Sequence, residues 1–364
     1  MTRIYLDYNA TSPLHPAVQE AMVQAMDLFG NPSSVHRDGV AARRIVTVAR
    51  ESLANRLNIK AGQILFTSGG SEANTTVLAA FAGKPVLCSA VEHASVMNNP
   101  HVTATIPVTQ AGLVDLNALK TMMDHHKPAL ISVMAANNET GVIQPMDDIA
   151  NLAYNAGVSL HCDMVQAFGK IALDDVLPYC DFATFAFHKI GGPKGVGAVV
   201  SRCADCIEPL IFGGNQEHRR RAGTENTVAL AGLTALCDAL SDQNHLRPLH
   251  DTMEATFKDN GGIVVGDNTP RLPNTTCVIM PRVSADTQVI HCDLAGISVS
   301  AGAACSSGKI TPSPVLRAMG FSETEAACAM RISSGHATTA QDFERISQSW
   351  LSLLQKYNDL QKVA

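Results

Sequence analysis

This sequence has no excess of basic residues, which weighs against a nucleic-acid-binding function. The 364 residues include 27 Lys and Arg against 33 Asp and Glu, which gives a formal net charge of -6 at pH 7. The one dense basic run, Arg219 to Arg221, is too short to hold a polyanion. We therefore expect no nucleic-acid partner.

Long apolar runs are missing as well. The N-terminal segment from Met1 to Asp7 has no apolar stretch of the kind found in signal peptides. No later segment approaches the roughly 20 apolar residues that a membrane-spanning helix needs. We therefore expect a cytoplasmic protein with no membrane partner.

Cysteines with the spacing of a disulfide framework or a metal site are also absent. The ten cysteines are scattered along the chain, a distribution that is consistent with reduced thiols. Cys203 and Cys206 form the one C-x-x-C motif, and it has no second pair and no nearby histidine. We therefore expect neither a metal site nor redox cycling at this motif.

What the sequence does contain is an alternation of short, strand-like apolar segments with amphipathic helical ones. The predicted strands are 63–67, 86–89, 129–135, 158–163, 182–187 and 198–201. Such alternation favours an α/β fold, in which helices flank a mostly parallel sheet. After about His245 the pattern changes to that of a second, smaller α+β domain.

The strand at 182–187 is followed by a turn that displays a lysine. Gly191, Gly192 and Pro193 stop the strand abruptly, so Lys189 lies at its carboxyl end. In open α/β sheets ligands bind at that edge, where a lysine could form a Schiff base with an aldehyde. The alternative interpretation is a surface lysine in a glycine-rich loop.

Two other strand-end loops carry groups that suit a phosphorylated cofactor. The segment 67–74 joins a strand to a helix, and its glycines and hydroxyls could offer free N–H groups to a phosphate, although a plain N-capping turn uses the same residues. Asp163 ends an apolar strand, where a carboxylate needs a cationic partner such as a protonated pyridine nitrogen. The alternative is that Asp163 caps the next helix.

Further loops add an imidazole, carboxamides, a thiol and a guanidinium. His93 suits ring stacking or proton transfer, although a lone histidine is more often structural, and Asn137–Asn138 also has the composition of a turn. Cys305 lies among small residues in a loop, a setting in which thiolate chemistry is possible. Arg331 has apolar neighbours and needs a carboxylate, either from the protein or from a ligand.

Together these motifs resemble the cysteine desulfurases of the NifS/IscS kind, which are pyridoxal-phosphate enzymes of the class V aminotransferase group. The matching segments, in chain order, are 5–11, 30–36, 67–74, 92–93, 137–141, 163–166, 188–189, 221–226 and the loop around Cys305. The resemblance implies a fold-type I PLP-dependent transferase that forms a homodimer. It also implies a large cofactor-binding domain at 14–245 and a small domain made of 1–13 and 246–364, which carries the catalytic cysteine loop.

The resemblance further implies roles for the cofactor-binding residues. Lys189 would form the Schiff base, Asp163 would hold the pyridine nitrogen and Gln166 would contact the ring hydroxyl. His93 would stack on the ring and move protons. Four residues would hold the phosphate, the last of them from the other subunit: Gly70, Ser71, His188 and Thr224.

The implied substrate is L-cysteine, whose carboxylate Asn138 and Arg331 would bind, with Asn138 also close to the cofactor. The Cys305 thiolate would attack the substrate sulfur and leave L-alanine and an enzyme persulfide. The sulfur would pass to an acceptor protein of unknown identity, for iron–sulfur cluster assembly or other sulfur trafficking. A selenocysteine lyase or another aminotransferase-type enzyme, which would not need Cys305, is one alternative. A catalytically idle relative that serves as an interaction partner is the other.

One residue departs from the resemblance. Ala186 stands two residues before His188, where the family commonly has a serine whose hydroxyl contacts the phosphate. If the chain is extended at this point, positions 186 and 188 face the same side. We therefore expect the missing hydroxyl to weaken retention of the cofactor.

Overall fold

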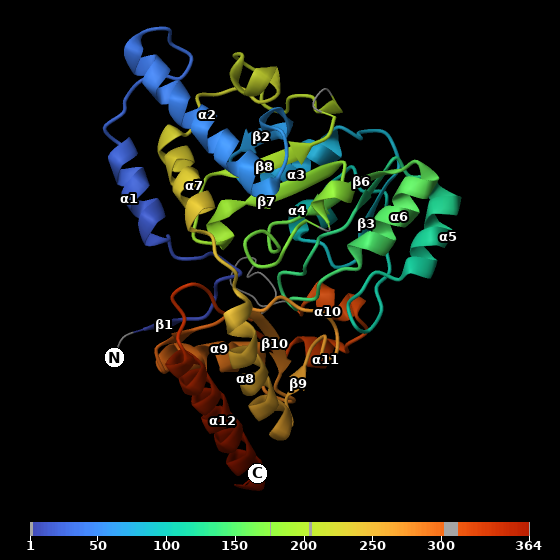
Figure 1. Cartoon of the computed structure of the whole chain (residues 1–364). Coiled ribbons are helices and arrows are strands. Elements are labelled where there is room, and N and C mark those ends of the chain that lie inside the picture. Colours follow the sequence, from blue (N-terminus) through green and yellow to red (C-terminus); the bar gives the residue numbers. More distant parts are fainter. Residues whose placement is uncertain (1–2, 175, 204–205, 302–311, 364) are drawn as a thin grey trace.

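A seven-stranded sheet forms the centre of the larger part of the molecule (Figure 1). The computed structural model describes residues 3–174, 176–203, 206–301 and 312–363. Neighbouring strands follow the order β2-β8-β7-β6-β5-β3-β4, and β8 runs antiparallel to both of its neighbours while the other pairings are parallel. This mostly parallel sheet confirms the predicted α/β fold. The strands are β2 Ile64–Thr67, β3 Val86–Ser89, β4 Ala104–Ile106, β5 Leu130–Ser132, β6 Ser159–Asp163, β7 Phe182–Ala186 and β8 Gly197–Ser201.

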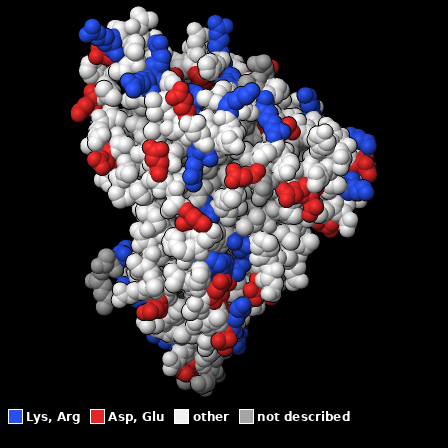
Figure 2. Space-filling model, viewed as in Figure 1, with Lys and Arg blue, Asp and Glu red and all other residues white. Residues whose placement is uncertain are grey.

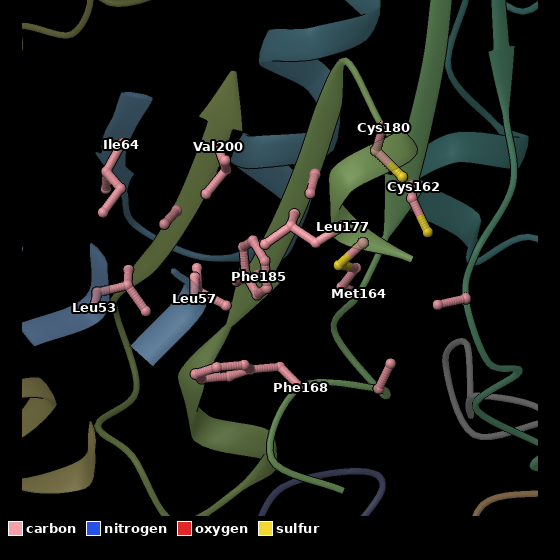
Figure 3. Close-up of a cluster of buried hydrophobic side chains, with 14 of the residues drawn as sticks. Leu53, Leu57, Ile64, Cys162, Met164, Phe168, Leu177, Cys180, Phe185 and Val200 are labelled. Atoms are coloured by element: carbon pink, nitrogen blue, oxygen red, sulfur yellow. The ribbon is translucent and has the colours of Figure 1, made fainter. Parts of the chain in front are cut away.

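Helices cover both faces of this sheet, because successive side chains of a strand point to opposite faces. Ile64 and Phe66 of β2 belong to one buried cluster, and Leu65 between them belongs to another. Figure 3 shows part of the first cluster, in which Val200 of β8 lies between Ile64 of β2 and Phe185 of β7. The helices of the first cluster are α1 Pro16–Ala25, α2 Arg37–Leu57, α5 Leu116–His126, α6 Met146–Ala156 and α7 Thr227–Ala239, and those of the second are α3 Gly70–Ala79 and α4 Ala94–Met97.

The smaller part of the molecule combines the N-terminal segment with the C-terminal third of the chain. Its antiparallel sheet has the order β12-β10-β9, and β1 pairs in parallel with β11. Leu6, Phe257 and Trp350 are almost completely buried in one cluster, and the two aromatic rings lie 4.6 Å apart between centroids. The elements are β1 Ile4–Tyr5, α8 Arg247–Asp259, β9 Ile263–Val264, β10 Thr275–Ile279, α9 Ala285–Leu294, β11 Ile297–Ser298, α10 Pro314–Ala318, α11 Glu323–Ala326, β12 Ala329–Ser333 and α12 Ala340–Val363.

Short 3-10 turns connect several of these elements. They are η1 Ala61–Gln63, η2 Leu177–Tyr179, η3 Phe187–Lys189, η5 Gln216–Arg219 and η6 Asn244–Leu246. Within the described ranges, every helix is too short or too polar to cross a membrane. On the face shown in Figure 2, acidic and basic side chains are interspersed.

The chain after β7 differs from the predicted extended strand. β7 ends at Ala186, and residues 187–189 form the 3-10 turn η3. Gly192 permits this turn, because a Cβ at that position would lie 2.7 Å from the main-chain oxygen of Phe187. The expectation that positions 186 and 188 share a strand face is therefore wrong. Of the strands in the large sheet, β4 was also not predicted.

The C-x-x-C motif differs from its prediction too. Cys203 and Cys206 form a disulfide bond, with their Cα atoms 5.4 Å apart. Both side chains are exposed, at the end of β8. The expectation of reduced thiols is therefore wrong for this pair, because the turn brings the two residues within bonding range. The described free cysteines are buried: Cys88, Cys162, Cys180, Cys237, Cys277, Cys292 and Cys328.

Candidate active site

Polar side chains meet where the parallel strands of the large sheet end. Asp163 is the last residue of β6, Lys189 ends the turn after β7, and His93 follows β3. Burial lowers the pKa of His93, and the charges of the other two residues also act on it, since the Asp163 carboxylate raises this pKa and the Lys189 ammonium lowers it. The structure therefore brings together three side chains that the sequence predicted for one site.

Lys189 has a reactive amine. Its Nζ donates hydrogen bonds to the main-chain oxygens of Asn9, at 3.0 Å, and Ala10, at 2.8 Å. Burial, followed by the positive charge of Arg331, lowers the pKa of Lys189 from 10.5 to about 8. In the described part of the chain the amine forms no ion pair with a carboxylate. A useful fraction of it is therefore the neutral, nucleophilic form near neutral pH.

Asp163 is buried, and each of its carboxylate oxygens accepts one hydrogen bond. The donors are Asn74 Nδ2, 2.8 Å from Oδ2, and the main-chain N–H of Val165, 2.9 Å from Oδ1. Thr184 Oγ1 donates to Asn74 Oδ1 at 2.6 Å and so fixes the direction of the amide. These contacts leave lone pairs on the carboxylate for a cationic ligand group.

Asn74 was not predicted from the sequence, although it links Asp163 to His93. Its Nδ2 also lies 2.9 Å from Ser95 Oγ, which in turn lies 2.8 Å from His93 Nδ1. The Ser95 main-chain N–H donates to the same His93 nitrogen, so Nδ1 is an acceptor and the neutral ring carries its proton on Nε2. A polar residue on the buried face of the helix after the Ser-Gly-Gly loop was the available signal.

The N-terminus of α3 suits a phosphate group. Its cap is Gly69, which has no side chain to satisfy the first N–H groups of the helix. A Cβ placed on Gly70 would lie 3.1 Å from Val165 Cγ2 and 3.3 Å from Ala186 Cβ, so position 186 faces this helix end. Ser71 is exposed in the first turn of α3.

His188 and Thr224, both predicted to contact the phosphate, have different surroundings. His188 Nδ1 lies 3.1 Å from Thr11 Oγ1, and burial, followed by the positive charge of Lys189, lowers the pKa of His188 to about 4. The imidazole is therefore neutral at physiological pH. Thr224 is exposed in the loop before α7, and the nearby ion pair between Arg221 and Glu72, at 3.0 Å, ties that loop to α3.

Arg331 lies on β12 and already has a carboxylate partner. Its Nη2 donates to Asp7 Oδ1 at 2.8 Å, and its Nη1 donates to the main-chain oxygen of Asn138 at 3.0 Å. Its buried Nε has no partner among the described residues. The structure therefore brings Arg331 and Asn138 together, and the guanidinium has a structural contact besides its predicted role in binding a ligand.

Gln166 is joined to two further residues that the sequence did not single out. Its Nε2 donates to the main-chain oxygen of Asn9 at 3.0 Å, and its Oε1 accepts from Lys170 Nζ at 2.6 Å. Cys305, the predicted nucleophile, lies outside the described residues.

These residues fit pyridoxal phosphate. The Lys189 amine matches its aldehyde, the buried Asp163 carboxylate matches a protonated ring nitrogen, and the uncapped start of α3 matches its phosphate. The Gln166 amide carries N–H groups of the kind that would match the ring hydroxyl.

Comparisons with known proteins agree with this chemistry. The family model described as aminotransferase class-V matches residues 4–346. A cysteine desulfurase of Cereibacter sphaeroides is 40% identical over 365 residues, which cover 95% of this chain and 94% of that protein. Cysteine desulfurase IscS of Dictyoglomus turgidum is 36% identical, with 93% and 91% covered. The X-ray structure of a NifS-like protein from Rickettsia africae is 34% identical and superposes with a TM-score of 0.89 over 97% of this chain and 99% of that one.

Proposed function

Because this chain belongs to the class-V aminotransferase family, we propose that it is a pyridoxal-phosphate-dependent cysteine desulfurase. It removes sulfur from L-cysteine, releases L-alanine and carries the sulfur as a persulfide on Cys305. The observation that carries this proposal is that Asp163 ends β6 and Lys189 lies in the turn after β7, the neighbouring parallel strand, where the charge of the carboxylate acts on the amine.

The side chains of the site divide the work. When bound, pyridoxal phosphate supplies an electron sink that weakens the bonds at Cα and Cβ of the substrate. Lys189 binds the cofactor and serves as the base at Cα. Asp163 would keep the ring nitrogen protonated, and His93, which has one ring nitrogen free of the Ser95 contact, would stack on the ring and move protons.

Sulfur transfer is assigned to Cys305. Its thiolate attacks the substrate sulfur and forms a new S–S bond while the Cβ–S bond breaks. The electron pair of the broken bond remains on carbon, and a proton completes alanine. Arg331 and Asn138 bind the substrate carboxylate, and Gly70, Ser71 and His188 bind the phosphate.

The quaternary and cellular setting is part of the same proposal. The enzyme is a homodimer in which Thr224 of the partner subunit completes the phosphate site. The large domain spans 14–245, and the small domain combines 1–13 with 246–364, a division supported by the separate buried clusters and by the pairing of β1 with β11. The protein acts in the cytoplasm and passes its sulfur to an acceptor protein.

Product analysis with L-cysteine tests the activity. Wild-type enzyme with pyridoxal phosphate and a reductant should release alanine and sulfide in equal amounts. Cys305→Ala should keep the visible absorbance band of the bound cofactor and yet release no sulfide, because only the thiolate step is lost. As a matched control, the double variant Cys203→Ser, Cys206→Ser should keep full activity. Full sulfide release by Cys305→Ala would instead indicate a lyase of the selenocysteine lyase type.

A further inference from the structure

Lys170 is a buried lysine that none of the roles above uses. It is 2% exposed, and its Nζ donates to Gln166 Oε1 at 2.6 Å and to Asn9 Oδ1 at 2.8 Å. Burial, followed by the positive charges of Lys189 and Arg331, holds the pKa of Lys170 well below its usual range. It forms no ion pair within the described ranges. Burying a polar group without partners is costly, and the side-chain amides of Gln166 and Asn9 are the partners of this amine. These two amides therefore indicate the role of Lys170.

The contacts of Gln166 determine which end of its amide faces which neighbour. A carboxamide can turn by 180° and exchange its C=O with its NH2. The main-chain oxygen of Asn9 can only accept a hydrogen bond, so Gln166 Nε2 must face it, at 3.0 Å. The amine of Lys170 then donates to the remaining end, Oε1. With both ends held, one N–H of Nε2 stays available for a ligand.

The second contact of Lys170 reaches Lys189 through Asn9. The main-chain oxygen of Asn9 accepts from Lys189 Nζ as well as from Gln166 Nε2. The side chain of Asn9 accepts a hydrogen bond from Lys170 Nζ at its Oδ1 and donates one from its Nδ2 to Thr275 Oγ1, at 2.9 Å. The Asn9 side chain also contacts the main-chain oxygen of Asn138, at 3.1 Å, and Asn274 Nδ2, at 3.4 Å, so the amine of Lys170 is one of several groups that position the main-chain carbonyl of Asn9.

We propose that Lys170 is a positioning residue that locks the Gln166 carboxamide, so that an N–H rather than a C=O faces the ring hydroxyl of bound pyridoxal phosphate. This inference rests on the proposed cofactor role of Gln166. The spacing of four residues between Gln166 and Lys170 suits this role, because residues four apart in a helical turn lie on the same side. The segment from Met164 to Lys170 does form such turns, with the N–H of Phe168 bonded to the oxygen of Met164 at 2.9 Å.

The absorbance of the bound cofactor reports on this contact in the absence of cysteine. The visible band changes with pH as the link between Lys189 and the cofactor loses its proton, and the midpoint of this change is the pKa of the link. An N–H donor stabilises the negatively charged ring oxygen most strongly when the link is deprotonated. The donor therefore lowers this midpoint. Lys170→Met, which keeps the length of the side chain without the amine, should raise that midpoint by roughly 0.5–1 pH unit, the equivalent of one hydrogen bond. Lys120→Met, at an exposed lysine of α5, is the control and should leave it unchanged.

A double-mutant cycle separates positioning from a direct effect of charge. Gln166→Leu should raise the midpoint by itself, and adding Lys170→Met to Gln166→Leu should change it no further, because Lys170 acts through Gln166. If Lys170→Met shifts the midpoint equally with and without Gln166, its amine acts directly on the cofactor and the proposal is overturned. An unchanged midpoint in Lys170→Met also overturns it.

A second variant and a measurement of alanine release complete the test of Lys170. If Lys170→Met does not fold, Lys170→Gln keeps a donor on a shorter side chain and should give a smaller shift, which must vanish in the Gln166→Leu background. Equal shifts in both backgrounds would reject the proposal. If the wild-type enzyme releases alanine and the Lys170 variants leave the midpoint unchanged, only the role of Lys170 is rejected and the desulfurase activity stands. The expected shifts without alanine release in the wild type support that role and reject the desulfurase activity.

Discussion

At the scale of single residues, the environment of Lys189 explains why this lysine can react. The hydrogen bonds to Asn9 and Ala10 orient its amine, and burial together with Arg331 disfavours its charge. A lysine with an ordinary pKa of 10.5 would be almost entirely protonated at neutral pH. With a pKa of about 8, roughly a tenth of the amine is neutral at pH 7.

This lowered pKa predicts how cofactor capture depends on pH. Capture needs the neutral amine, so the rate at which cofactor-free enzyme takes up pyridoxal phosphate should rise with pH and level off above about pH 8. Stopped-flow absorbance between pH 6 and pH 10.5 measures it, and Lys189→Ala should form no band that borohydride can fix. A rate that keeps rising to pH 10 would show that Lys189 has an ordinary pKa.

Among the secondary-structure elements, the end of β7 and the start of α3 lie together at the proposed phosphate site. Ala186 closes β7 and lies against Gly70 at the N-terminus of α3, where a Cβ on Gly70 would be 3.3 Å from its methyl group. This contact supports the position expected for residue 186, although the strand alternation that led to the expectation does not hold. A hydroxyl added at 186 would therefore lie close to the start of α3, where the phosphate is proposed to bind.

Ala186→Ser should therefore slow the loss of cofactor. One added hydrogen bond to phosphate is worth about 1 kcal/mol, which corresponds to roughly fivefold slower loss, while the chemical step stays nearly unchanged. Dialysis followed by absorbance measures the loss, with Ala82→Ser, at an exposed position just beyond the other end of α3, as the control. Equal or faster loss from Ala186→Ser would place the phosphate away from residue 186.

For the whole molecule, Arg331 joins three distant parts of the chain. It lies on β12, pairs with Asp7 after β1 and donates to the main-chain oxygen of Asn138 after β5. The same guanidinium is proposed to bind the substrate carboxylate, so its structural and ligand contacts compete for a limited number of N–H groups.

Arg331→Lys keeps the charge and loses the fork of N–H donors. We expect binding of L-cysteine to weaken by roughly 1–3 kcal/mol, measured by absorbance titration in a Cys305→Ala background that prevents turnover. Arg37→Lys, at an exposed arginine of α2, is the control. A lower thermal midpoint with unchanged binding would show that Arg331 serves only the contacts with Asp7 and Asn138.

The proposed dimer makes a prediction for the complete assembly. Large apolar side chains are exposed near α1, α2 and the loop before η5, including Phe29 at 85%, Val35 at 91% and Phe212 at 82%. Exposed apolar side chains that gather into a contiguous patch mark interaction surfaces, and these residues are the candidates for the proposed subunit contact. Sedimentation of the full chain should therefore show a dimer.

Subunit mixing tests whether Thr224 acts across that dimer. Thr224→Val alone should retain less cofactor, and Lys189→Ala should form no linked cofactor. A mixed dimer of the two has one site with an intact Lys189 and, from the partner subunit, an intact Thr224. Mixing should therefore restore retention at one site per dimer. No restoration, with exchange of subunits verified by mass, would place Thr224 in its own subunit's site.

The sequence by itself determined the fold class and predicted which side chains would meet at the strand ends. Apolar periodicity and glycine-rich turns are local properties, so the alternation of strands and helices could be predicted, and with it the gathering of Asp163, His93 and Lys189 at the strand ends. The motifs around these residues carried the resemblance that the comparisons confirm.

Only the tertiary structure decided how the site is supported. Asn9 meets Lys170, and Arg331 meets Asp7, across 161 and 324 residues of chain, and no local pattern signals contacts of that range. The 3-10 turn at Lys189 likewise depends on the close approach of Gly192 to Phe187, which only a residue without a Cβ permits. Such contacts depend on how the two sheets and the N-terminal segment pack, because packing selects one arrangement of side chains from many that the local sequence permits.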